Sequence, residues 1–273
     1  MKKLERRRPT ARRGLSTAVS MLFIIFSLTI VSTIAYSYAL NRMGNRKEDL
    51  KLYAAEEKML DMEEAISDVA WSPGSVRTLA FSDYGGQLRT EPSTNHLLIN
   101  VTMDGSTYTI FDDDTGQIIY ELPSTVIGRY GVWIRGDDRS IVNQSASYQA
   151  QMNVDIGEEH EELITRYRPL LSSSTGDLVS DRRINNIRIY IINLNSSETI
   201  ESGGEFHVKA VGDSVTTTVH NYDLDASVTE IEIKAVLKGT QGTIEVPLTT
   251  SPSGSTVKIE VVICIVKIEE VNV

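Results

Sequence analysis

The sequence is poor in cysteine, with Cys264 as the only one among 273 residues. A single cysteine cannot form an intramolecular disulfide, and it cannot supply the several thiolates of a cysteine-based metal site. It lies in an apolar run, residues 261–266, which is typical of a small core residue. Hydrophobic residues make up 41% of the chain, and this proportion favours a folded body and excludes wholesale disorder.

Basic residues are scarce after the first fourteen positions. Residues 1–14 hold seven Lys and Arg and one acid, Glu5, although the whole chain has a formal net charge of −10. The remaining residues carry 20 basic and 36 acidic side chains, a balance of −16. Because binding to nucleic acid requires a basic surface that neutralises phosphates, the acidic body argues against a nucleic-acid partner.

Charged residues are absent between positions 14 and 41, and residues 15–40 also lack Gly and Pro. As a helix rising about 1.5 Å per residue, this segment spans about 39 Å, enough to cross a hydrocarbon core of about 30 Å with some tilt. The preceding basic block predicts a cytoplasmic N-terminus, because Lys and Arg resist transfer across a membrane. The sequence therefore predicts a basic leader over residues 1–14 and a transmembrane or assembly helix over residues 15–40.

Three interpretations of this segment are open. It can be an uncleaved signal anchor, or a secretory signal peptide cleaved after Ser37-Tyr38-Ala39. The third interpretation is a prepilin leader that ends at Gly14 and leaves Leu15 as the new N-terminus. A secretory signal places its small residues after the apolar run and discards the run, whereas here Gly14 precedes it.

The stretch Arg12-Arg13-Gly14-Leu15 resembles the N-terminus of archaeal type IV pilin-like proteins and archaellins, which carry a class III signal peptide. The resemblance covers residues 1 to about 70. It implies that a prepilin peptidase processes the chain at Arg12, Arg13, Gly14 and Leu15, and that the apolar helix is retained. Bacterial pilins carry Glu at the fifth mature position, where this chain has Val19, and this departure indicates the archaeal type.

The helix is expected to continue as an extracellular amphipathic stem over residues 41–72, with a soft point at Met43-Gly44-Asn45. Apolar residues three or four positions apart form a stripe along one face, namely Leu52, Ala55, Met59, Met62, Ile66 and Val69. This stripe suits a domain helix packed on a sheet and equally the lower half of a pilin stem. Trp71-Ser72-Pro73-Gly74 is expected to end the helix.

Short β-branched runs separated by turn residues follow, so the expected fold is an α+β protein whose globular region is a mainly antiparallel sandwich. Asp104-Gly105 and Asp113-Asp114-Thr115-Gly116 predict hairpins, and residues 158–171 a short helix or a loop. Residues 171–176 read as a linker. This predicts two β-rich domains, residues 73–175 and 176–273, with a single larger sandwich as the alternative.

Three sequons mark N-glycosylation acceptors on an exported surface: Asn100, Asn143 and Asn195. Two further patterns resemble catalytic motifs but are incomplete. Asp114-Thr115-Gly116 has the triplet of aspartic proteases, yet no second copy exists to share a proton. His160-Glu161-Glu162 begins like a zinc-protease helix, but the required second histidine is replaced by Ile164.

Metal and cofactor signals are equally incomplete. Asp112, Asp114 and Gly116 match part of an EF-hand loop whose twelfth position is Pro123, so the bidentate carboxylate is missing. A loose calcium contact at the Asp112–Asp114 turn is left open as the lesser alternative to a plain turn. We therefore expect no catalytic, cofactor-binding or metal-binding residue, no cofactor, and no enzymatic activity.

The resemblance implies a non-enzymatic archaeal cell-surface protein with its N-terminus cytoplasmic and its body extracellular. Its partners would be the membrane, the prepilin peptidase and, through residues 15–40, other pilin-like subunits in a filament. The 259 residues left after cleavage favour a minor or accessory subunit involved in filament assembly or adhesion. The alternative is a single-pass membrane protein with an extracellular β-sandwich binding domain that forms no filament.

Overall fold

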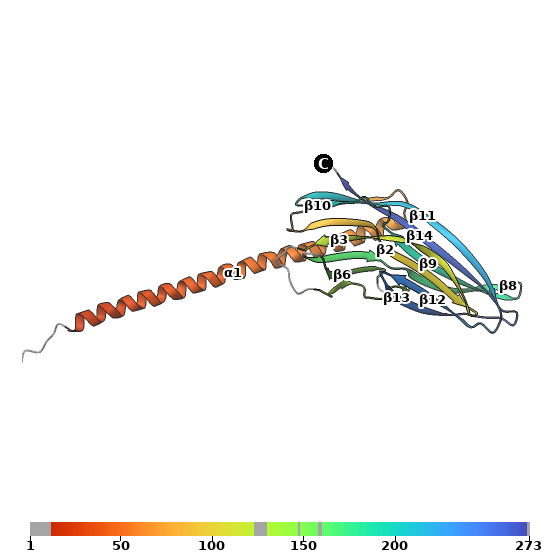
Figure 1. The fold of residues 1–273 in the computed structure, drawn as a ribbon, viewed down its shortest axis with the longest axis horizontal. Helices are drawn as coiled ribbons and strands as arrows, with labels where there is room; N and C mark the ends of the chain where they lie inside the picture. The colour runs from red at the N-terminus through yellow and green to blue at the C-terminus, as the bar shows by residue number, and fades with distance from the viewer. Residues whose placement is uncertain (1–11, 123–129, 147, 158–159, 272–273) are drawn as a thin grey trace, which may run out of the picture. The chain divides into compact units, whose positions relative to one another are not determined.

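The computed structural model of the chain describes residues 12–122, 130–146, 148–157 and 160–271. It divides into two compact units, Met1–Leu50 and Lys51–Val273. A long helix, α1 (Arg12–Ala70, 59 residues), begins in the first unit and ends in the second (Figure 1). The soft point expected at Met43-Gly44-Asn45 is not a break, since all three residues are helical. The helix ends at Ala70, and a turn through the expected stop signal follows.

The body is built from strands that form two sheets. The strands are β1 (Val76–Phe81), β2 (Gln87–Met103), β3 (Ser106–Glu121), β4 (Trp133–Arg135), β5 (Val142–Asn143), β6 (Ala150–Ile156), β7 (Glu161–Tyr167), β8 (Leu170–Val179), β9 (Arg182–Asn193), β10 (Glu201–Gly203), β11 (Phe206–Leu224), β12 (Glu230–Leu237), β13 (Thr240–Pro247) and β14 (Ser255–Val271).

One sheet has six strands in the order β1-β11-β14-β9-β8-β5. The other has eight, in the order β13-β12-β2-β3-β7-β6-β4, with β10 paired to β2. All pairings are antiparallel except those of β14 with β9 and of β5 with β8. The sheets curl along their length (Figure 1). The expected mainly antiparallel β body is therefore confirmed.

Two apolar clusters lie between the sheets. The first joins α1 to β11 and β14 of the six-stranded sheet and to β2, β3, β6 and β7 of the eight-stranded sheet. The second joins β9 and β14 to β2 and β12. Because each cluster draws on both sheets, the sheets face one another as a sandwich, and burial of these side chains is the main stabilising contribution.

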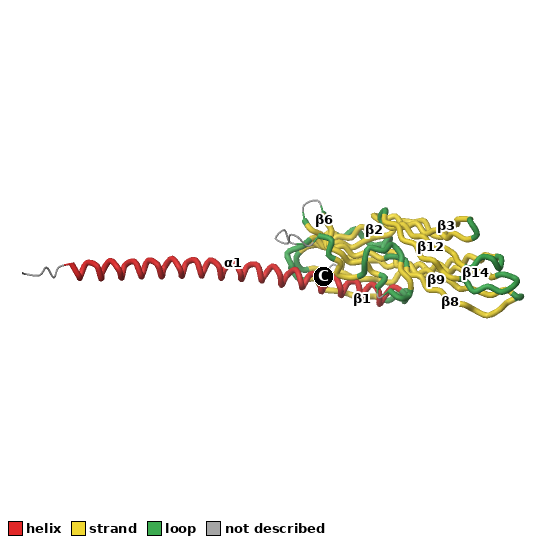
Figure 2. Tube along the Cα trace, turned by 90° about the horizontal axis from the view of Figure 1, so that it is seen from below, coloured by secondary structure: helices red, strands yellow, loops and turns green. Residues whose placement is uncertain are grey.

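The C-terminal turns of α1 form part of the first cluster, beside the strands (Figure 2). The whole apolar stripe expected on this helix is buried, with no side chain more than 5% exposed: Leu52, Ala55, Met59, Met62, Ile66 and Val69. The stripe is therefore confirmed, and it packs within the body to which it belongs. A helical spacing of three and four places all six side chains on one face, which explains why they are buried together.

β11 approaches the end of α1 closely at Gly212. The N–H of Gly74 donates to the carbonyl oxygen of Gly212 at 2.7 Å, and the N–H of Gly212 donates to that of Ser75 at 3.0 Å. A Cβ atom on Gly212 would collide with the carbonyl oxygen of Val69. A larger residue therefore does not fit there unless the end of the helix moves.

One expected hairpin is confirmed and the other is wrong. Asp104 and Gly105 connect β2 to β3 with φ angles of 47° and 72°, the left-handed conformations that a two-residue hairpin requires. Asp113-Asp114-Thr115-Gly116 lies inside β3, where it pairs with β2. The hydroxyl of the buried Thr115 donates to the carbonyl oxygen of Asn95 at 3.1 Å. Pairing along β2 thus outweighs the local turn preference.

The expected division into domains 73–175 and 176–273 is not observed. Residues 171–176, expected to be a linker, lie inside β8. β1 pairs with β11, and β2 pairs with β12, so strands from both halves of the chain share each sheet. Of residues 158–171, expected to form a short helix or a loop, residues 158–159 lie outside the described residues, and the others mostly form β7 and the start of β8. The alternative of one larger sandwich describes the body.

Candidate functional site

An exposed apolar segment dominates the first unit. Every described side chain between residues 19 and 44 is exposed, and the segment includes Phe23 (66%), Ile24 (67%) and Phe26 (60%). An 18-residue window of α1 has a mean hydropathy of 2.1, and the helix is long and apolar enough to cross a membrane. An all-round apolar surface of this length is unfavourable in water, so lipid or protein has to cover it.

Hydroxyl groups within this segment are satisfied by the helix itself. Thr29 Oγ1 donates to the carbonyl oxygen of Ile25 at 2.9 Å, and Thr33 Oγ1 donates to that of Thr29 at 2.8 Å. These bonds remove the cost of placing a free hydroxyl in an apolar environment. These two threonines bond back to the main chain of their own helix, so the segment presents an apolar surface despite its Ser and Thr content.

The residues expected at the processing site lie at the start of α1. Arg12, Arg13, Gly14 and Leu15 are helical, but their side chains lie outside the described residues. The rest of the basic leader, residues 1–11, also lies outside them. The structure therefore does not test the resemblance that rests on these residues.

The three sequons occupy different environments. Asn100 lies in β2 between β3 and β12, and its Oδ1 accepts a hydrogen bond from Thr109 Oγ1 at 2.8 Å. Asn143 ends β5 and is exposed, with its Oδ1 accepting from the N–H (3.1 Å) and the Oγ (2.5 Å) of Ser145. Asn195 follows β9 and is half-buried. Only Asn143 therefore combines an exposed amide with a local turn.

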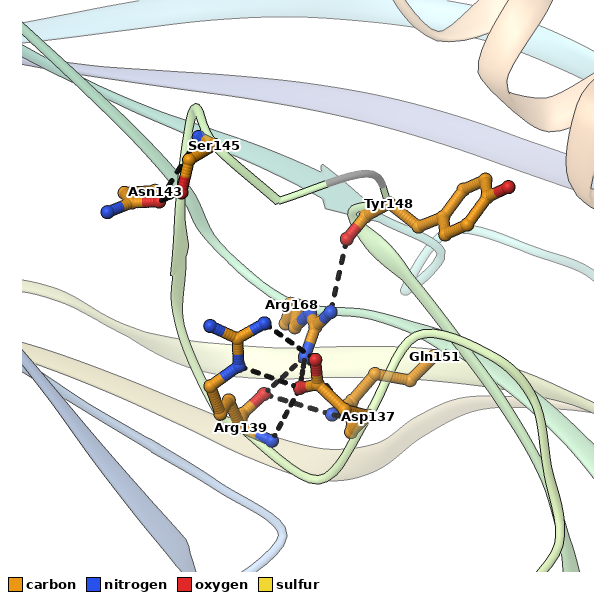
Figure 3. Close-up of polar contacts among 7 residues, drawn as sticks. All are labelled: Asp137, Arg139, Asn143, Ser145, Tyr148, Gln151 and Arg168. Carbon is orange, nitrogen blue, oxygen red and sulfur yellow. Dashed lines mark hydrogen bonds and ion pairs between the residues drawn. The ribbon is translucent and has the colours of Figure 1, made fainter.

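A polar cluster that the sequence did not reveal is formed by Asp137, Arg139 and Arg168 (Figure 3). Arg168, between β7 and β8, is 1% exposed, and its guanidinium contacts the carboxylate of Asp137. Arg168 Nη1 also donates to the carbonyl oxygen of Arg139 at 3.0 Å, and Nη2 to that of Tyr148 at 3.1 Å. The buried charge is thus compensated by a carboxylate and by main-chain acceptors.

Arg139 and Gln151 complete this cluster. Arg139 binds both carboxylate oxygens of Asp137, with Nε 3.0 Å from Oδ1 and Nη2 2.6 Å from Oδ2. Gln151 Nε2 donates to the carbonyl oxygens of Asp137 at 2.7 Å and of Arg139 at 3.0 Å. The guanidinium of Arg139 holds the pKa of Asp137 well below its usual range; burial opposes this shift and Arg168 adds to it.

A cleft of about 400 Å³ lies over the cluster, lined by residues 134–137, 139, 145, 146, 148 and 168. Across it, the guanidinium of Arg135 lies 4.6 Å from the ring centroid of Tyr148. Arg139 and Arg168 both pair with Asp137, so one carboxylate faces two guanidinium groups, and these contacts fasten the loop to the sheets. The sequence alone assigned no role to these residues, and burial of Arg168 depends on strands that only the fold brings together.

The two incomplete Asp-containing motifs lie on one strand, β3, whereas Glu161 and Glu162 of the third lie in β7. Asp112 and Asp114 lie in β3 on either side of His96, at 3.1 Å from its Nε2 and 3.3 Å from its Nδ1. His207 and His220 lie in β11. Among the described residues, no group of three or more His, Cys, Asp or Glu side chains is arranged to hold a metal ion.

Cys264 lies in β14 and is fully buried, which confirms its interpretation as a core residue. Its Sγ contacts the carbonyl oxygen of Ala70 at the end of α1. Burial raises the pKa of its thiol to about 12. The sulfur is therefore protonated at neutral pH and is a packing group.

Comparison of the chain with protein-family models, with curated proteins and with solved structures finds no match.

Proposed function

We propose that this chain is a non-enzymatic, membrane-anchored surface protein of the archaeal type IV pilin-like class, with a minor or accessory role in filament assembly or adhesion. In this proposal a prepilin peptidase cuts between Gly14 and Leu15. The apolar segment, residues 15–40, then stays in the membrane or packs among other subunits. The body, residues 51–273, lies outside the cell.

The observation that carries the proposal is an uncharged, exposed apolar segment in the same helix that supplies part of the body's core. Val19 and Phe26 are exposed, whereas Met59 and Ile66 of α1 are fully buried. A cut after Gly14 removes only the first three residues of α1. A cut after Ala39 would fall inside the helix, far from either end. A retained apolar helix therefore fits the position of the glycine before it.

Mass spectrometry of the mature N-terminus tests this proposal. The protein would be produced in an archaeal host that has a prepilin peptidase, and we expect its first residue to be Leu15. A first residue of Leu40 would instead identify a secretory signal peptide. An intact leader would identify the alternative, a single-pass membrane protein that does not assemble.

A bulky substitution at the cut provides the matched experiment. Gly14→Phe should leave the leader in place, because the peptidase requires a small residue before the cut if the resemblance holds. Gly44→Phe is the control, since Gly44 lies in the same helix with open space around it. The proposal predicts normal processing of the control, and it is wrong if Gly14→Phe matures as efficiently as Gly44→Phe.

A further inference from the structure

The outer edge of β11 is open along more than half of its length. β1 pairs with β11 only from Val211 to Phe206, while β14 pairs with its other side as far as Leu224. Among the described residues of Lys51–Val273, no strand pairs with the outer edge of residues 213–224. Main-chain groups alternate in direction along a strand, so every second residue there directs its N–H and C=O away from β14.

This edge lacks the residues that normally prevent edge-to-edge pairing. Residues 214–222 read Ser-Val-Thr-Thr-Thr-Val-His-Asn-Tyr and contain no Lys, Arg, Asp, Glu, Pro or Gly. Thr and Val favour extended backbone. Thr216, Thr217, Thr218 and Val219 are all exposed. In an acidic body, an uncharged edge is also the place where two copies can approach with least repulsion.

Several other sheet edges are protected, although the outer edge of β1 and that of β3 over residues 106–117 are also unpaired among the described strands. Along β13, Ser140 Oγ donates to the carbonyl oxygen of Thr240 at 2.7 Å, and the strand carries the charged Glu245 and ends at Pro247. β8 carries a register irregularity between Thr175 and Leu178. β4 and β5 are only three and two residues long. Short strands, irregularities, charges and proline are the usual means of blocking an edge, and β11 has none of them over residues 214–222.

The sequence of this edge is self-complementary. Val215-Thr216-Thr217-Thr218-Val219 reads the same in both directions about Thr217. In an antiparallel pair with a two-fold axis at Thr217, each Val215 faces Val219 of the other copy, and each Thr216 faces Thr218. Pairs of β-branched residues directly opposite one another stabilise antiparallel strands, and a two-fold interface requires such self-matching.

We propose that two copies of this chain associate through the open edge of β11, antiparallel and with Thr217 opposite Thr217 of the second copy. The two six-stranded sheets then become one continuous sheet across the interface. The association goes beyond the proposed surface role and does not depend on how the leader is processed.

Cysteine cross-linking of the full-length chain in detergent tests the register. Opposite residues of an antiparallel pair have Cα atoms about 4.5–5.5 Å apart, within the range that a disulfide spans. Under mild oxidation, Thr217→Cys should therefore form a covalent dimer at least about ten times faster than Thr243→Cys, an equally exposed position on the protected edge of β13. The wild type, whose only cysteine is buried, should form none.

Mixed variants separate this interface from association through the apolar helices. Val215→Cys and Val219→Cys should each cross-link poorly alone, and rapidly when the two are mixed. Thr217→Lys, which sets two like charges opposite each other, should weaken the dimer about tenfold in sedimentation equilibrium with an unchanged circular dichroism spectrum. The proposal is overturned if Thr217→Cys reacts no faster than Thr243→Cys, if Val215→Cys alone matches the mixture, or if Thr217→Lys leaves the dimer intact.

Discussion

Glu63 of α1 and Arg135 of β4 form an ion pair across 72 residues of sequence, and the Glu63 side chain in it is only 7% exposed. The carbonyl oxygen of Glu63 also accepts a hydrogen bond from the hydroxyl of the buried Tyr167 at 3.3 Å. The helix is thus held in the sandwich by polar contacts as well as by its apolar stripe.

Removal of Arg135 should destabilise the fold, because it leaves the buried carboxylate of Glu63 without its counter-charge. We expect Arg135→Ala to lower the free energy of unfolding by about 2–3 kcal/mol, measured by chemical denaturation. Arg77→Ala is the matched control, since Arg77 pairs with Asp68 of α1 at the surface with both side chains about half exposed. The control, Arg77→Ala, should lower the free energy of unfolding by about 0.5 kcal/mol. Equal losses would contradict the role assigned to burial.

Truncation of the apolar stripe should open a cavity in the first cluster. Ile66 is fully buried, so Ile66→Ala should lower the free energy of unfolding by about 3 kcal/mol. Glu57→Ala, on the exposed face of the same helix, should change it by less than about 0.5 kcal/mol. Thermal denaturation of the two variants compares them, and a stable Ile66→Ala variant would show that this part of the helix does not pack as described.

Low pH should lower the stability that the ion pairs of Asp137 give to the fold. The pKa of Asp137 is lower in the folded protein than its unfolded value near 3.9, so its ionised form stabilises the fold above that pH. This contribution is lost as the pH falls below about 4. Asp137→Asn should therefore unfold more easily at pH 7 and show a weaker acid dependence. Asp138→Asn, at an exposed neighbour, should follow the wild-type pH profile.

Cys264 should resist modification while the protein is folded. Its thiol is buried and its pKa is raised to about 12, so almost no thiolate is present at pH 8. Ellman's reagent should react slowly with native protein and within minutes in denaturant. The exposed thiol of Thr217→Cys gives the rate for an accessible group in the monomer. Fast labelling of native wild-type protein would contradict the assignment of Cys264 to the core.

Glycan occupancy should differ among the three sequons. Asn143→Gln should remove a glycan from protein made in a glycosylating archaeal host, because Asn143 is exposed at the end of a two-residue strand. Asn100→Gln should leave the glycan mass unchanged, since Asn100 lies inside a sheet with neighbours on both sides. Mass spectrometry of intact protein distinguishes these outcomes, and a glycan on Asn100 would require attachment before the sheet forms.

Local patterns predicted the helix and its buried stripe, because helical periodicity depends on residues only a few positions apart. The same holds for the Asp104-Gly105 hairpin, whose two φ angles are set by the turn itself. The hairpin predicted at Asp113–Gly116 is wrong because pairing between β2 and β3 overrides the local turn preference. Burial of Arg168 and the pairing of β1 with β11 depend on contacts between distant parts of the chain, which spacing and composition do not encode.

The position of β14 has a consequence for biogenesis. This strand, residues 255–271, lies between β11 and β9, at the centre of its sheet, so a nascent chain cannot complete that sheet until these residues have been synthesised. Pairings of such long sequence separation form slowly. A chain that stops short of residue 255 would leave two strands without their shared neighbour, and quality-control proteases should recognise it as unfinished.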